Sequence, residues 1–82
     1  MKNNDIITLD DNKRYAICKS CIYDDREFLL LIEVDEDENL LNKGLIVEKI
    51  NDGKNIKIVD DDILRYLISQ KFAEIIINDF KN

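Results

Sequence analysis

The sequence predicts an α+β fold: an antiparallel β-meander of about five strands, with one C-terminal helix packed on one face. Short runs rich in β-branched and aromatic residues alternate with Asp, Asn and Gly clusters that favour turns. Helical spacing of apolar residues is confined to the end of the chain. Because the 82 residues contain no Pro-, Ser- or Gly-rich linker, residues 1–82 are expected to form a single small domain.

Charge and composition restrict the classes of function. The net charge of −6 argues against direct nucleic-acid binding, since phosphate contacts require Lys and Arg. The first five residues, Met-Lys-Asn-Asn-Asp, have no apolar signal segment behind them, and no apolar run approaches the roughly 18 residues of a membrane span. We therefore expect a cytoplasmic protein with two reduced thiols and no membrane partner. The lack of proline and the many Asn, Lys and Ile residues resemble proteins of low-GC bacteria and their phages.

The first strand is predicted within residues 5–9, Asp-Ile-Ile-Thr-Leu, ahead of a turn cluster at residues 10–13. A two-residue loop at Asp11-Asn12 would pair Thr8 with Tyr15 and Ile6 with Ile17.

A central hairpin is predicted over residues 15–34, with Asp24-Asp25 as its two-residue loop. That loop pairs Cys21 with Phe28, Lys19 with Leu30, Ile17 with Ile32 and Tyr15 with Val34. Side chains alternate across a strand, so these residues share one face, which is the predicted core face. The other face then carries Ala16, Cys18, Ser20 and Ile22 opposite Glu33, Leu31, Leu29 and Glu27.

A polar connection is predicted over residues 35–44, with room for a helical turn at Leu40-Leu41. Asp52-Gly53 then lies between two alternating β-branched runs, and it suits the two positive-φ positions of a type I′ turn. The resulting register pairs Val47 with Ile58, Lys49 with Ile56 and Glu48 with Lys57.

The C-terminal helix is predicted to begin at Asp60 or Asp61, whose carboxylate can cap the free amides of the first turn. Apolar residues follow at helical spacing: Ile63, Leu64, Leu67, Ile68 and Phe72. In the tail, Ile75, Ile76 and Phe80 form a stripe rotated from the first one. A helix is preferred there, with a break near residues 69–71 or a strand over residues 74–78 as alternatives.

Two acid- or thiol-containing motifs were considered for chemistry. Cys18-Lys-Ser-Cys21 has the spacing of a redox pair or half a zinc site, but residues three apart in a regular strand point to opposite faces. Packing is the preferred interpretation, and a zinc- or redox-linked dimer is the alternative. Asp35-x-Asp37-x-Asn39 resembles the start of a calcium loop, but Leu40 and Ile46 replace the Gly and Glu that such a loop needs.

The sequence does not predict an enzyme. With no histidine there is no imidazole base, and the two glycines cannot form a phosphate-binding loop. We therefore expect no catalytic residues, no metal and no cofactor.

The face of the sheet away from the predicted core is unusually apolar. It would carry Ile7, Ala16, Cys18, Ile22, Leu29, Leu31, Ile46, Ile50 and, at its end, Val59. Such a patch usually marks an interface, unless the tail or residues 35–44 cover it. The predicted protein-binding residues are Cys18, Leu29, Leu31, Ile46 and Ile50, and the partner is another protein or a second copy.

The order of these segments resembles a known family. An acidic Ile-Ile-Thr-Leu strand leads through Asp-Asp-Asn-Lys-Arg-Tyr into the central hairpin, where Tyr23-Asp-Asp-Arg-Glu-Phe-Leu-Leu-Leu stands in place of Tyr-Asn-Gly-Lys-x-Tyr-x-x-Leu. An acidic linker, a second hairpin and Asp-Asp-Asp-Ile-Leu-Arg-Tyr-Leu follow. Over residues 5–72 the layout is similar to the small acidic YrzB-like proteins of Firmicutes. This resemblance implies a fold and a bacterial cytoplasm, and no site residues.

The main functional hypothesis is a non-enzymatic protein-binding module that acts through its sheet face. A first alternative is a phage-type acidic inhibitor, an anti-defence protein or nucleic-acid mimic that blocks a basic nucleic-acid-handling protein. A second alternative is the dimer linked through Cys18 and Cys21.

Overall fold

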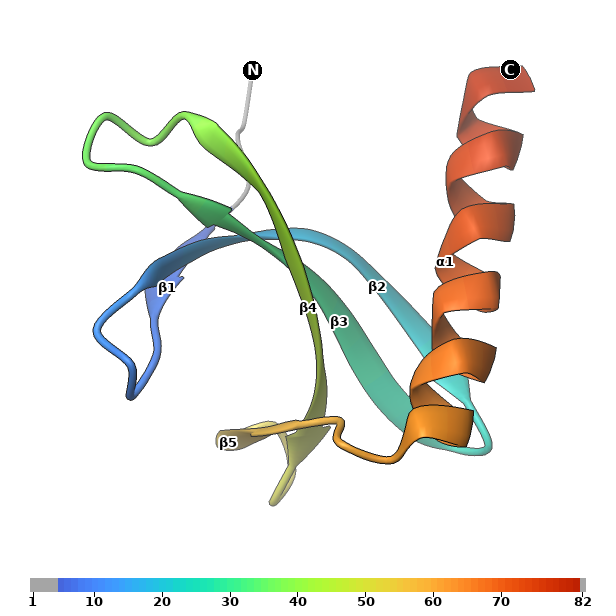
Figure 1. The fold of residues 1–82 in the computed structure, drawn as a ribbon. Helices are drawn as coiled ribbons and strands as arrows, with labels where there is room; N and C mark the ends of the chain where they lie inside the picture. The colour runs from blue at the N-terminus through green and yellow to red at the C-terminus, as the bar shows by residue number, and fades with distance from the viewer. Residues whose placement is uncertain (1–4, 82) are drawn as a thin grey trace.

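The predicted meander and its C-terminal helix are confirmed in a computed structural model that describes residues 5–81 (Figure 1). Residues 1–4, whose polar sequence argued against a signal segment, lie outside this range. Five strands form one antiparallel sheet in the order β1-β2-β3-β4-β5. The strand bounds are Ile6–Thr8 (β1), Arg14–Tyr23 (β2), Arg26–Val34 (β3), Leu40–Ile50 (β4) and Asn55–Ile58 (β5), and the helix α1 covers Asp62–Lys81.

Two of the three predicted hairpin turns are confirmed. Asp24 and Asp25 join β2 to β3, with φ of 56° and 60°. Asp52 and Gly53 have φ of 57° and 83°, and the three predicted β4–β5 pairs are present. Asn51 is also left-handed, with φ of 54°, so Ile50–Asn55 is the last pair of that ladder.

The predicted pairing of β1 with β2 is wrong by one residue, since Ile7 faces Tyr15 and Thr8 faces Arg14. The loop has three residues. The Leu9 amide donates to the Lys13 carbonyl at 3.1 Å, the Asn12 amide donates to the Leu9 carbonyl at 2.9 Å, and Asn12 has φ of 64°. A tight turn followed by one left-handed residue is a common alternative to the two-residue loop.

The loop between β3 and β4 has the same geometry as the loop between β1 and β2. The helical turn predicted at Leu40-Leu41 is wrong. Both leucines begin β4. The amides of Asp37 and Asn39 each donate to Asp35 Oδ1 at 2.9 Å. The bond from the Asn39 amide is the largest cause that lowers the pKa of the Asp35 carboxyl, and the bond from the Asp37 amide adds to it. Both bonds close a short loop where a long connection was expected.

A β-bulge at Cys18 changes half of the central hairpin. The predicted pairs Cys21–Phe28 and Lys19–Leu30 are present, but Ile17 faces Leu31. The extra residue turns every side chain before it to the other side of the sheet. The predicted pairs Ile17–Ile32 and Tyr15–Val34 are therefore wrong, and Tyr15 faces Glu33.

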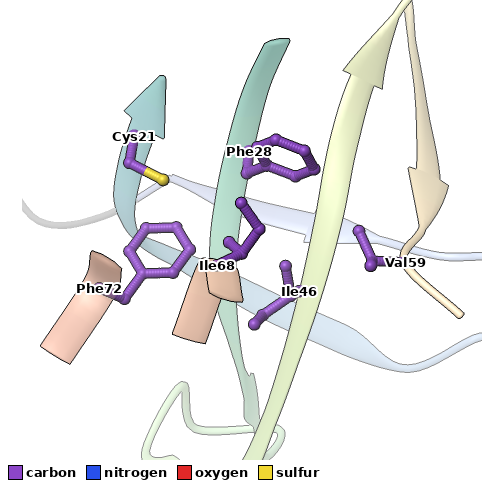
Figure 2. Close-up of a cluster of buried hydrophobic side chains, with 6 residues drawn as sticks. All are labelled: Cys21, Phe28, Ile46, Val59, Ile68 and Phe72. Carbon is purple, nitrogen blue, oxygen red and sulfur yellow. The ribbon is translucent and has the colours of Figure 1, made fainter. Parts of the chain in front are cut away.

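Both faces of the sheet are consequently buried in their central parts. On one face, Ile68 and Phe72 of α1 pack against β2, β3 and β4 in a helix-side cluster of Cys21, Phe28, Ile46, Val59, Ile68 and Phe72 (Figure 2). On the other face lies a concave-side cluster of Tyr15, Leu29, Leu31 and Val47. The sheet curls around this second cluster, because Ile7 from one edge strand and Ile56 from the other both pack against it (Figure 1).

The helix α1 runs without a break from Asp62 to Lys81, so the preferred helical interpretation of the tail is confirmed. The Leu64 amide donates to Asp61 Oδ1 at 3.0 Å, which confirms Asp61 as the cap. Ile68 and Phe72 face the core, whereas Ile63 and Leu67 are exposed. The side chain of Phe80, predicted for the tail stripe, lies outside the described part of the structure. Over residues 5–81, no helix combines the length and the apolar character needed to cross a membrane.

Candidate functional site

The five predicted protein-binding residues do not form one open patch. Leu31 is fully buried in the concave-side cluster, and Ile46 is buried under α1 on the opposite side of the sheet. Ile46 faces Leu30 across β3 and β4, so its predicted place beside Leu29 is wrong. Cys18, Leu29 and Ile50 remain, and each of them lines a surface hollow.

The first hollow, called the sheet groove, lies on the concave side and has a volume of about 450 Å³. Its lining comes from all five strands and the β4–β5 turn: Ile7, Ile17, Cys18, Lys19, Ser20, Glu27, Leu29, Lys49, Gly53 and Ile56. Because β1 and β5 are the two edges of the sheet, the groove exists only where the sheet curls. The apolar part of its lining adjoins the concave-side cluster, so buried side chains support the groove from below.

Polar side chains flank the apolar part of the groove. Lys49 Nζ lies 3.4 Å from Glu27 Oε1, so two opposite charges at the groove partly neutralise one another. Ser20 lies on β2 close to the bulge at Cys18. A pocket with an apolar lining and a few polar groups is the usual form of a binding site, in which the polar groups orient what is bound.

The Cys18 thiol is a weak nucleophile in this setting. Burial raises its pKa, and the Lys19 ammonium opposes that shift without reversing it. A raised thiol pKa reduces the thiolate fraction near neutral pH, and the thiolate is the reactive form. The groove therefore presents Cys18 mainly as a small polarizable contact surface.

The second hollow adjoins the sheet groove, since the two share Glu27, Lys49 and Gly53. It has a volume of about 460 Å³ and lies between the β2–β3 and β4–β5 turns. Ile50 lines it together with Arg26 and Glu48. Arg26 donates two hydrogen bonds to Glu48 there, and these bonds, opposed by burial, lower the pKa of the Glu48 carboxyl.

The two cysteines lie on opposite sides of the sheet despite the bulge. Cys18 lines the sheet groove, and Cys21 packs in the helix-side cluster beside Phe72 (Figure 2). Neither is in a disulfide. Among residues 5–81, no group of three or more Cys, Asp or Glu side chains is placed to hold a metal ion.

Ile56 and Lys49 were not singled out for the site by sequence reasoning, although the predicted β4–β5 register already placed them opposite each other. The missing information was the curl of the sheet, which brings β5 towards β1 and leaves no pattern in a short stretch of sequence.

A comparison of the chain with protein-family models, curated proteins and solved structures found no match. The YrzB-like layout therefore stays a prediction.

Proposed function

We propose that the protein is a non-enzymatic binding module that holds an apolar side chain of a protein partner in the sheet groove. One observation carries the proposal: an open hollow of about 450 Å³ joins the two edges of the sheet, and apolar side chains make up the larger part of its lining. Protein interfaces are commonly anchored by a few large side chains that fill such hollows while polar groups surround them. The Glu27–Lys49 pair and Ser20 supply polar groups of that kind.

The non-enzymatic part of the proposal rests on the environment of the acidic groups. Acid–base chemistry by two carboxylates needs one of them desolvated, so that their pKa values separate. Over residues 5–79, no charged or polar side chain is fully buried, and the chain contains no histidine. Binding is therefore favoured over catalysis.

The experiment compares two isoleucines of β5. Ile56 lines the groove, whereas Ile58, two residues later, is 52% exposed and lies outside the groove lining. Immobilised wild-type protein, Ile56→Lys and Ile58→Lys are each used to capture partners from host lysate, and circular dichroism checks that each variant is folded. We expect a partner that binds wild type and Ile58→Lys but is lost with Ile56→Lys. A partner held equally by all three would count against the groove.

Labelling of Cys18 provides a second, independent measure. In a Cys21→Ser variant, a bulky thiol-reactive dye on Cys18 should block capture, and a bound partner should slow the labelling reaction.

Salt dependence separates the proposal from the acidic-inhibitor alternative. Burial of an apolar anchor varies little with ionic strength, whereas binding to a basic groove weakens steeply as salt is raised.

A further inference from the structure

The face of α1 turned away from the sheet carries large apolar side chains that the rest of residues 5–81 leaves exposed. Ile63 is 75% exposed, Tyr66 63%, Leu67 38% and Ile77 53%. Gln70 and Ala73, between them, are exposed as well. Figure 1 shows the sheet on one side of α1 only. These six residues are called the outer stripe.

The outer stripe is separate from the stripe that α1 uses for its own fold. Ile68 and Phe72 face the sheet as members of the helix-side cluster, and the partly buried Leu64 packs against it. Ile63, Tyr66, Gln70, Ala73 and Ile77 follow one another at alternating steps of three and four, which is the spacing of a helix–helix contact seam. A helix that is apolar on two opposite sides is normally buried on both.

We propose that a second copy of this chain covers the outer stripe, with the two α1 helices packed antiparallel about a two-fold axis near Gln70. A two-fold contact needs a surface that is complementary to itself. Ile63 and Ile77 lie seven residues before and after Gln70, so each would meet the other isoleucine of the second copy. Leu67 would lie opposite the small Ala73, and the two Gln70 amides could hydrogen-bond to each other across the axis.

Charge selects the antiparallel direction. The helix begins after Asp60 and Asp61 and has Asp62 in its first turn. Parallel packing would set these three carboxylates of one copy beside the same three of the other. Antiparallel packing would separate them by roughly the length of the helix, about 30 Å at 1.5 Å per residue. None of the six residues of the outer stripe is charged, although the exposed Glu74 lies on the same face, one turn after Gln70.

The available area fits a weak dimer. Scaled by the exposed fractions, the four large side chains offer on the order of 500 Å² per copy, and two copies would bury about 1,000 Å², the lower end of specific interfaces. The sheet groove lies on the other side of the sheet from α1, so the dimer would leave it open. The inference therefore stands apart from the proposed function.

Sedimentation equilibrium from low to high micromolar concentration tests the contact. We expect the mean mass of the wild type to rise from 9.7 kDa towards twice that value. Tyr66→Lys and Ile77→Lys should each raise the dimer dissociation constant at least about tenfold, since they place charge in an apolar seam. The matched control is Ile22→Lys in β2, because Ile22 and Tyr66 are both 63% exposed. A wild-type chain that stays monomeric at every concentration overturns the proposal, as does an equal loss with Ile22→Lys.

Cross-linking tests the direction of packing. In a Cys18→Ser background, Ile63→Cys and Ile77→Cys are oxidised alone and as a mixture, with Cys21 protected in the core. Antiparallel packing predicts a disulfide-linked dimer in the mixture and little in either variant alone. Self-cross-linking of Ile63→Cys alone would overturn the antiparallel arrangement.

Discussion

Arg26 and Glu48 form a two-point ion pair between β3 and β4. Arg26 Nε donates to Glu48 Oε2 at 2.9 Å, and Arg26 Nη2 donates to Glu48 Oε1 at 2.8 Å. The guanidinium carbon lies 5.3 Å from the centre of the Phe28 ring, which is fully buried in the helix-side cluster. Because the planar guanidinium matches the carboxylate at two points, the pair fixes geometry as well as charge. It connects the start of β3, directly after the turn of the central hairpin, to β4 at the rim of the core.

Glu48→Gln should destabilise the fold in a pH-dependent way. Hydrogen bonds from Arg26 hold the pKa of Glu48 below its ordinary value, although burial opposes this. The ionised group therefore contributes stability above its unfolded pKa of about 4.3, and this contribution is lost as pH falls through the folded pKa. We expect urea unfolding to show wild type more stable than Glu48→Gln at neutral pH, with the difference shrinking below about pH 4.

A double-mutant cycle provides the control for this pair. If the pair is the cause, Arg26→Gln and Glu48→Gln should each destabilise at neutral pH, and the double variant should cost less than their sum. Additive effects, or a difference that does not change with pH, would show that Glu48 acts through packing alone.

Asp61→Ala should destabilise α1 by about 1 kcal/mol, because it removes the hydrogen bond to the Leu64 amide. The matched control is Asp60→Ala, one residue earlier, which changes the net charge equally but does not remove the cap. Urea unfolding followed by circular dichroism gives both values. Equal losses for the two variants would mean that charge near the helix end matters and the cap does not.

The two glycines should respond oppositely to alanine. Gly53 has φ of +83°, so Gly53→Ala forces a side chain into a left-handed turn and should cost about 1–2 kcal/mol. A Cβ on Gly44 would meet Ile32 Cδ1 at 3.6 Å, an ordinary contact. Gly44→Ala should therefore be neutral or stabilising by up to about 1 kcal/mol, since it restricts the unfolded chain. Thermal melts of both variants decide this, and a Gly44→Ala loss as large as that of Gly53→Ala would refute it.

The strand order and two of the turns could be predicted because local patterns determine them. Asp52-Gly53 and Asp24-Asp25 lie where the chain must adopt positive φ, and Asp61 lies where the first helical amides need an acceptor. The three-residue loop before β2 could not be told from a two-residue loop, since Asp11 and Asn12 suit both.

The sides of β2 were harder to assign because both are apolar. Either Tyr15 and Ile17 or Ala16 and Cys18 could point to a given face of the sheet, so hydrophobicity alone does not locate the bulge. One signal was present in β3, whose unbroken apolar run over residues 28–32 is typical of a strand buried on both faces. That run indicates that the face assigned to a partner is largely occupied by the protein's own core. The sheet groove could not be predicted, because it depends on curvature that brings two distant edge strands together.

The two cysteines should react with thiol reagents at clearly different rates. Burial raises both pKa values, so each should react more slowly than an unstructured thiol at neutral pH. Cys18 is partly exposed at the sheet groove, whereas Cys21 is 8% exposed in the core beside Phe72. We expect Cys21→Ser to leave one moderately slow thiol, and Cys18→Ser to leave one that reacts only when the protein opens.

A variant with a less tightly packed core gives a further test of the difference in reactivity between Cys18 and Cys21. Phe72→Ala removes a ring that covers Cys21 and should cost about 3–5 kcal/mol. Its effect on reactivity should be large for Cys21 and small for Cys18, because α1 does not cover the groove side of the sheet. Equal reaction rates in the wild type, or rapid formation of a Cys18–Cys21 disulfide, would contradict their separation by the sheet. Either result would revive a redox role for the Cys18-Lys-Ser-Cys21 motif, whereas two independent thiols with no bound zinc and no interchain disulfide would remove the zinc- or redox-linked dimer.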